Sequence, residues 1–206
     1  MTGKELLADY DVSRETIEKL GVYAALLQKW NPAINLVAPS TLATLWSRHF
    51  LDSAQIIDLT PESMKTWCDM GTGGGFPGLI VAIMAQDRDP KRQTVCIESD
   101  IRKATFLRTV VREADVNATI LSERIEAVTP QNADVVSARA LAPLKDLLGY
   151  ADRHLAPAGM GIFLKGENYR SEVEEALEVW RFQLDTYPSK THPDAVVLKI
   201  GDLNRA

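Results

Sequence analysis

The residues best suited to hold a ligand form a glycine-rich run, CDMGTGGGFPG, at positions 68–78. Glycine allows left-handed backbone conformations and lets a ligand approach the main chain closely. Pro77 suits the first turn of a helix, and the start of a helix presents N–H groups that have no partner within the helix. The run therefore predicts a strand–loop–helix turn that binds a nucleoside-containing cofactor.

Two cofactor classes fit this turn. Gly73, Gly75 and Gly78 match the pattern G-x-G-x-x-G, and Glu98 follows at the distance of a ribose-binding acid, so an NAD-dependent oxidoreductase is one alternative. A P-loop is excluded because no G-K-[ST] follows. Asp69, at the end of the first strand, is expected to bind the amino group of the cofactor. This favours S-adenosylmethionine, which carries an ammonium and a sulfonium group but no phosphate. Glu98 serves either cofactor.

Two cations stand where strands are expected to end, Arg139 and Lys165. In an open parallel sheet the carboxyl ends of the strands border the ligand site, so we expect both side chains to point into one site. There they can hold a substrate. The alternative is that they form ion pairs with Asp69, Glu98 or Glu126.

From residue 66 onward, short apolar runs alternate with helical stretches. This alternation predicts an α/β fold with a mainly parallel sheet covered on both faces. The expected strands span 66–70, 93–99, 117–122, 133–139 and 159–166, and two more, at 181–187 and 194–200, form an antiparallel pair.

The preceding residues, 1–60, read as a helical extension to the α/β domain at 61–206. Ser13 is expected to cap a first helix, which Asn31-Pro32 ends, and Ser40 to cap a second.

Composition limits the remaining possibilities. The 206 residues carry a net charge of −5, which argues against a protein that binds nucleic acid through counterion release alone. The two cysteines, Cys68 and Cys96, offer no disulfide framework and no metal-ligand spacing, so we expect a reduced cytoplasmic protein without a metal, with both thiols in its core. The polar, acidic start is unlike a signal peptide, and no apolar run is long enough to span a membrane.

Six segments together resemble one family. They are WNPAINLV (30–37), RHFLDS (48–53), DMGTGGGFPG (69–78), RKATFL (102–107), SARAL (137–141) and FLKG (163–166). The chain resembles the RsmG or GidB family of bacterial methyltransferases, which methylate N7 of a guanine in 16S rRNA. The resemblance implies a class I S-adenosylmethionine-dependent methyltransferase fold with a helical N-terminal extension.

The resemblance also implies roles for individual residues. Cofactor contacts would come from Gly71, Gly73, Phe76, Glu98, Ile125, Glu126 and Arg139, with Glu98 at the ribose and residues 125–126 at the adenine. Arg139 and Lys165 would position the substrate, by holding RNA phosphate or hydrogen-bonding O6 of the guanine. Some members carry an arginine before the last strand, where this chain offers only His192. We expect His49 to be structural, and the acidic run to be an exposed helix face: Glu172, Glu174, Glu175 and Glu178.

The expected chemistry needs no general base, because N7 of guanine is an unprotonated lone-pair nucleophile. The sequence accordingly lacks the Asn/Asp-Pro-Pro-aromatic motif of amino-group methylation after the fourth strand. The expected partner is 16S rRNA within the small subunit or an assembly intermediate, bound by a monomer. Besides the oxidoreductase, a ribosome-assembly binding module with a degenerate cofactor site remains an alternative.

Overall fold

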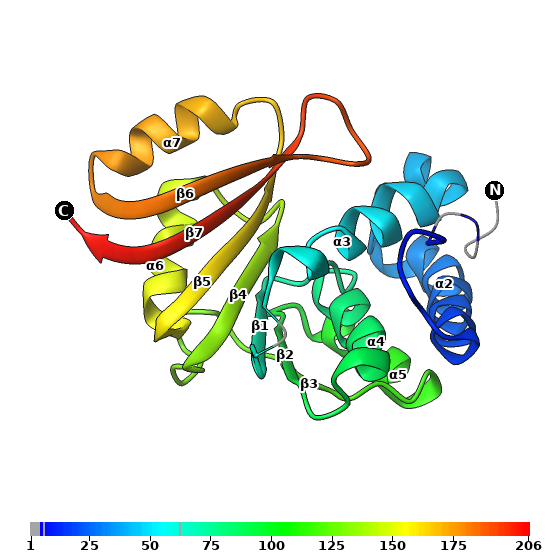
Figure 1. The fold of residues 1–206 in the computed structure, drawn as a ribbon. Helices are drawn as coiled ribbons and strands as arrows, with labels where there is room; N and C mark the ends of the chain where they lie inside the picture. Colours follow the sequence, from blue (N-terminus) through cyan, green and yellow to red (C-terminus); the bar gives the residue numbers. More distant parts are fainter. Residues whose placement is uncertain (1–4, 6, 62) are drawn as a thin grey trace.

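The computed structural model describes residues 5, 7–61 and 63–206. Seven strands form one sheet in the order β3-β2-β1-β4-β5-β7-β6 (Figure 1). The strands β1 to β5 are parallel, and β7 runs antiparallel to both β5 and β6. This confirms the expected mainly parallel sheet with an antiparallel pair at the end of the chain. The strands are β1 Thr66–Met70, β2 Gln93–Ile97, β3 Ala118–Leu121, β4 Ala133–Arg139, β5 Leu155–Lys165, β6 Trp180–Pro188 and β7 Val196–Arg205.

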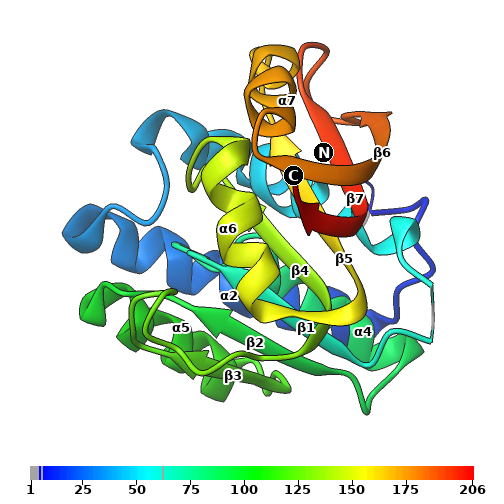
Figure 2. The ribbon, with the colours of Figure 1, turned by 90° about the vertical axis from the view of Figure 1, so that its left-hand side faces the viewer.

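Helices cover both faces of the sheet (Figures 1 and 2). One face carries α4 (Gly78–Arg88) and α5 (Ile101–Glu113), with α2 (Arg14–Ile34) packed outside them. The other carries α6 (Leu144–His154) and α7 (Tyr169–Leu177). Each face has its own apolar core. Residues 78–85 of α4 are all buried because this helix lies between the sheet and the N-terminal helices.

The N-terminal segment is less regular than expected. Ser13 caps α2 as predicted, through a hydrogen bond from the amide of Thr16 to its Oγ. The predicted end at Asn31-Pro32 is wrong: the helix continues to Ile34 and ends at Asn35, whose φ of 49° is left-handed. Ser40 does not cap a second α-helix, because a 3-10 segment begins at Pro39 there. The remaining elements are η1 (Pro39–Thr44), a π-helical turn η2 (Trp46–Leu51), α3 (Asp52–Ala54) and a 3-10 turn η3 (Ile57–Leu59).

Aromatic rings join this segment to the sheet domain. The ring of Tyr23 on α2 stacks on Phe50 of η2 at 5.2 Å and on Phe76 of the glycine-rich loop at 5.5 Å. On α2, Trp30 packs against Phe106 of α5, with ring centroids 5.8 Å apart. The N-terminal helices thus share one apolar core with α4 and α5, directly behind the glycine-rich loop.

Both cysteines lie buried within strands, as expected, and they remain free thiols. Among the described residues, no His, Cys, Asp and Glu side chains gather in a way that could hold a metal ion. None of the described helices combines the length and the apolar character needed to cross a bilayer.

Candidate functional site

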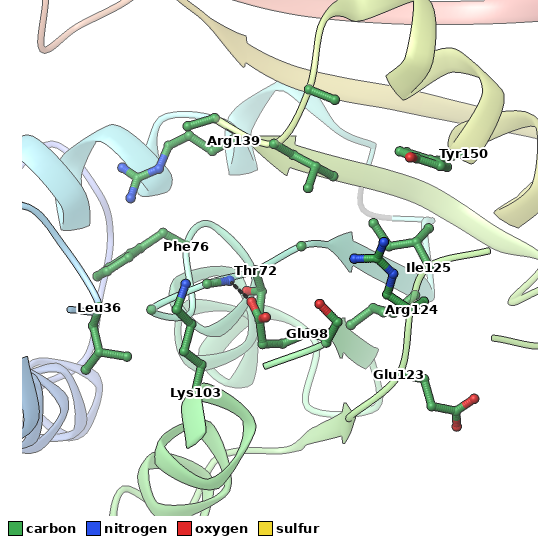
Figure 3. Close-up of a pocket in the computed structure, with 18 of the residues that line it drawn as sticks. Leu36, Thr72, Phe76, Glu98, Lys103, Glu123, Arg124, Ile125, Arg139 and Tyr150 are labelled. Atoms are coloured by element: carbon green, nitrogen blue, oxygen red, sulfur yellow. Dashed lines mark hydrogen bonds between the residues drawn. The ribbon is translucent and has the colours of Figure 1, made fainter. Parts of the chain in front are cut away.

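A cavity of about 440 Å³ opens at the carboxyl ends of β1 to β4 (Figure 3). The loops that follow these four strands line it, at positions 71–76, 98–99, 123–126 and 139–142. β1 lies between β2 and β4, so the strand order reverses here, and such a switch point is where open α/β sheets bind ligands. The cavity is therefore the candidate cofactor site.

The glycine-rich loop takes conformations that other residues adopt only with strain. The φ angles of Gly71, Gly73 and Gly75 are 60°, 59° and 101°. At Gly78 the reason is space, because a Cβ there would lie 2.7 Å from Sγ of Cys96. Beside Gly73 the nearest atom to such a Cβ is a backbone oxygen at 3.9 Å, so the loop leaves room for a ligand at this point.

Glu98 connects the loop to the end of β2. Its Oε2 accepts a hydrogen bond from the amide of Gly73 at 2.8 Å, and its Oε1 accepts one from the amide of Asp100, also at 2.8 Å. Each carboxylate oxygen has a second lone pair. Glu98, which lines the cavity, can therefore hold the loop and still accept hydrogen bonds from two ribose hydroxyls.

Asp69 lies beneath the loop and does not line the cavity. Its side chain is fully buried, with Oδ1 accepting from the hydroxyl of Ser137 at 2.6 Å and Oδ2 accepting from the amide of Gly78 at 2.9 Å. Burial raises the pKa of the Asp69 carboxyl to about 6, although these hydrogen bonds oppose the shift. The direct contact with a cofactor's amino group that we expected is not retained, since no surface of Asp69 is accessible. It supports the loop instead.

The segment after β3 forms the far wall of the cavity. Ile125 is buried and lines the cavity, while Glu126 is exposed at its rim and accepts a hydrogen bond from the hydroxyl of Tyr150 at 3.2 Å. Nε2 of the fully buried His154 lies 3.0 Å from the carbonyl oxygen of Ile125. Because a carbonyl only accepts, His154 donates this bond and fixes the backbone of the segment.

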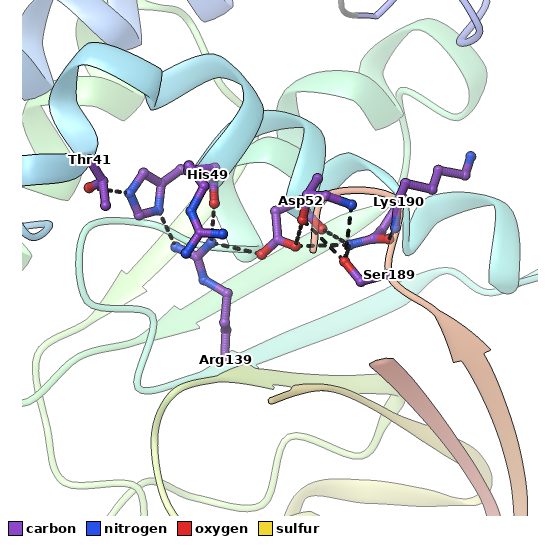
Figure 4. A network of polar contacts seen from close by, with 9 residues as sticks. Thr41, His49, Asp52, Arg139, Ser189 and Lys190 are labelled. Atoms are coloured by element: carbon purple, nitrogen blue, oxygen red, sulfur yellow. Dashed lines mark hydrogen bonds and ion pairs between the residues drawn. The ribbon is translucent and has the colours of Figure 1, made fainter. Parts of the chain in front are cut away.

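Arg139 stands between the glycine-rich loop and the N-terminal helices (Figure 3). Its guanidinium lies 4.8 Å from the ring centre of Phe76. Its Nη1 pairs with Oδ2 of Asp52 at 3.1 Å, and its Nη2 lies 2.9 Å from Nδ1 of His49 (Figure 4). The carboxylate of Asp52 also accepts from the hydroxyl of Thr191, in the β6–β7 loop, at 2.7 Å. Three distant parts of the chain thus meet at Arg139.

The contact between Arg139 and His49 fixes the tautomer of the histidine. Arginine only donates, so Nδ1 of His49 must accept, and the ring proton sits on Nε2, which lies 2.8 Å from Oγ1 of Thr41. Burial, followed by the charge of Arg139, lowers the pKa of His49 to about 4. The ring also stacks on Phe76 at 5.1 Å. The expected structural role of His49 therefore includes holding the arginine that borders the cavity.

Lys165 faces a second cavity of about 930 Å³ rather than the first. Its Nζ lies 2.5 Å from Oε2 of Glu172 and donates to the carbonyl of Ala142 at 2.9 Å. The alternative, in which these cations pair with Asp69, Glu98 or Glu126, is wrong. Lys165 pairs with Glu172, and Arg139 pairs with Asp52. Glu172 is half-buried, so the expectation that it lies on an exposed helix face is wrong for this member of the acidic run.

Sequence reasoning assigned no site role to Asp52, Glu172 or Thr191. A signal existed for Asp52, which lies in the quoted segment RHFLDS together with His49. Nothing in the sequence separates Glu172 from the neighbouring acids of its helix.

The comparisons with known proteins agree with this geometry. The family described as rRNA small subunit methyltransferase G, GidB, matches residues 16–194. The chain belongs to this family. A relative named ribosomal RNA small subunit methyltransferase G, from Cereibacter sphaeroides, is 50% identical over 203 residues, which cover 98% of each chain. A relative of the same name from Ruegeria pomeroyi is 47% identical and covers 95% of each chain. The family resemblance predicted from six segments is therefore confirmed.

Solved structures share the fold of this GidB-family chain at low sequence identity. A ribosomal protein L11 methylase from Lactobacillus delbrueckii matches with a TM-score of 0.60 and 17% identity, covering 75% of this chain and 78% of that one. An O-methyltransferase from Bacillus cereus, in complex with SAH, matches with a TM-score of 0.57 and 13% identity, covering 97% of this chain and 96% of that one. The expected class I methyltransferase fold is confirmed.

The oxidoreductase alternative loses its support. The dinucleotide-binding sheet has the strand order 3-2-1-4-5-6, whereas here the antiparallel β7 is inserted between β5 and β6. The glycine pattern alone did not distinguish these folds, but the strand order and the membership of the GidB family do.

Proposed function

We propose that this chain transfers the methyl group of S-adenosylmethionine to N7 of a guanine in the 16S rRNA of the small ribosomal subunit. The observation that carries the proposal is the match to the rRNA methyltransferase family along nearly the whole chain, at 50% identity. The position on the base rests on the family resemblance and on the absence of a motif for amino-group methylation after β4.

The first cavity suits this cofactor. Glu98 has lone pairs free for two ribose hydroxyls, and the open backbone beside Gly73 leaves room for the methionine portion. The family resemblance assigns the adenine to Ile125 and Glu126, which both line this cavity together with Phe76. When bound, S-adenosylmethionine supplies an electrophilic methyl group.

The residues around the site position the substrate and need not remove a proton, because N7 carries none. Well-oriented reactants gain roughly 7–11 kcal/mol from positioning alone. Lys165 donates two of its three N–H groups to Glu172 and Ala142, which leaves one for O6 of the guanine. Arg139 holds Phe76 against the cofactor cavity through its contact with the ring.

The acidic net charge of −5 favours a structured particle over naked RNA as the substrate, since binding of naked RNA relies on an excess of positive charge. We propose that a monomer acts, in the cytoplasm, on the small subunit or on an assembly intermediate. Comparable activity on a short naked RNA hairpin would refute the requirement for a particle.

The decisive test is to map methylated positions in rRNA from cells with and without the gene, and to restore the mark with purified protein and labelled cofactor. We expect one guanine to lose and regain its N7 methyl group. Cofactor binding without any transfer to ribosomal particles would instead favour a binding module.

A further inference from the structure

The second cavity, of about 930 Å³, borders the first along one short segment. Residues 139–142 line both cavities, so a group held in the second lies next to the cofactor site. Its size falls in the range of about 300–1,000 Å³ that is typical of small-molecule sites. The N-terminal helices, the end of β5 and the β6–β7 loop complete its walls.

Most charges in this cavity neutralise one another. Arg139 pairs with Asp52, and Lys165 pairs with Glu172. One cation that lines the cavity, Arg48 on η2, is exposed, and its side chain forms no ion pair or hydrogen bond with any residue that the structure describes. Two carboxylates of the lining, those of Glu167 and Asp194, are likewise exposed and have no hydrogen-bond or ion-pair partner within residues 5, 7–61 and 63–206.

These free charges match a guanosine nucleotide. A phosphate needs a cation, which Arg48 supplies as a fork of N–H donors. Guanine places its acceptors N7 and O6 on the Hoogsteen edge, and its donors, N1–H and the 2-amino group, on the adjoining Watson–Crick edge. A carboxylate accepts from that donor edge and discriminates against adenine, which presents an acceptor at N1.

We propose that the second cavity receives the target guanosine nucleotide, with its phosphate on Arg48 and the donor edge of its base toward Glu167 and Asp194. N7 then faces residues 139–142 and the cofactor beyond them. This inference rests on the proposed function and adds the residues that select the nucleotide. The paired Arg139 keeps the wall in place, Lys165 retains one N–H for O6, and Arg48 carries the charge that a phosphate meets.

The first test compares Arg48→Gln with Lys29→Gln. Lys29, on α2, is also exposed and has no ion-pair partner in the described part of the chain, but it does not line the cavity. Both variants therefore lose one surface charge. Binding to unmethylated small ribosomal subunits is measured at several salt concentrations. Arg48→Gln should reduce the slope of log affinity against log salt by about 0.7–1, the value for one phosphate contact, and Lys29→Gln should leave it unchanged. Equal slopes for the two variants overturn the proposal.

The second test asks whether neutralising the two carboxylates strengthens or weakens binding to the small subunit. Glu167→Gln and Asp194→Asn each remove one negative charge. If these carboxylates faced phosphates, neutralising them would strengthen binding to the subunit. We expect weaker binding instead. The double variant Glu167→Gln/Asp194→Asn should raise KM roughly tenfold, because the hydrogen bonds from the guanine to the two carboxylates are lost. Unchanged or stronger binding overturns the assignment of the guanine edge.

Wild-type protein separates this inference from the function on which it rests. If wild-type protein transfers no methyl group to any rRNA, the proposed function fails. If it transfers and Arg48→Gln behaves like Lys29→Gln, only the nucleotide cavity fails. Calorimetry with S-adenosylmethionine should give the same affinity for all four variants, because none of the changed residues lines the first cavity.

Discussion

The carboxylate of Glu172, on α7, lies 2.5 Å from the ammonium group of Lys165 at the end of β5. The same oxygen, Oε2, accepts a hydrogen bond from the amide of Leu144, the first residue of α6, at 2.8 Å. Lys165 in turn donates to the carbonyl of Ala142. The pair therefore fixes both ends of residues 142–144, which begin at the last residue of the segment that both cavities share.

Glu172→Gln tests this arrangement. The amide can still accept from Leu144 but loses the charge that holds Lys165. We expect kcat to fall about tenfold, in line with a charged hydrogen bond of about 1.5–3 kcal/mol, while KM and cofactor affinity change little. Lys165→Ala should abolish transfer and keep cofactor binding. The control for Glu172→Gln is Glu174→Gln, which makes the same change of charge at an exposed position on the same helix. If the two glutamine variants have equal kcat, Glu172 does not position Lys165.

Glu98→Gln should weaken binding of S-adenosylmethionine by about ten- to a hundredfold, because the carboxylate both orders Gly73 and offers lone pairs to the ribose. Isothermal titration measures this directly. Glu123→Gln, at the exposed rim of the same cavity, is the matched change and should cost less than a factor of two. Similar losses in both variants would mean that only the overall charge of the cavity matters.

The pH dependence of stability should report on His49. Burial and Arg139 lower its pKa to about 4, from about 6.5 in the unfolded chain. Between these values the unfolded state binds more protons, so the free energy of unfolding falls as the pH falls from about 6.5 to about 4. Denaturant titrations should show a smaller loss for His49→Gln than for wild type.

The buried His154, whose pKa burial also lowers, remains in both proteins and cancels in that comparison. The exposed His192, changed to glutamine in the same way, serves as the control. Parallel curves for wild type and His49→Gln would show that the contact between Arg139 and His49 does not resist protonation.

Alanine substitutions at three glycines should distinguish the cost of steric overlap from the cost of a strained backbone conformation. Gly78→Ala would place a methyl group 2.7 Å from Cβ of Asp69, and we expect a loss of about 1–3 kcal/mol of stability from overpacking. Gly73→Ala has room but strains a residue with φ of 59°, at about 1–2 kcal/mol. Gly149→Ala, inside α6 with 3.9 Å to the nearest atom, should be neutral or stabilising by up to about 1 kcal/mol.

Thermal or denaturant unfolding without cofactor measures these changes. In addition, Gly73→Ala should weaken S-adenosylmethionine binding, because its Cβ would enter the cavity. Full affinity in that variant would contradict the placement of the cofactor along this loop.

The sequence alone determined the parts of the protein that depend on local pattern. The strands β1 and β4 match their expected bounds because buried parallel strands are rich in apolar residues over a short stretch. Glu98 and the glycines of the loop could be found by spacing, since they lie within one strand–loop–helix–strand unit.

Only the tertiary structure decided which charges meet. Asp52 and Arg139 are 87 positions apart, and no periodicity connects them. Glu172 and Glu174 share one acidic run, yet one is half-buried against Lys165 and the other is exposed. The difference arises because α7 packs against the start of α6, and a helix buries only the residues that face its neighbour. The residue type shows that a side chain is charged, but the packing decides whether that charge is already paired or is free to bind a substrate.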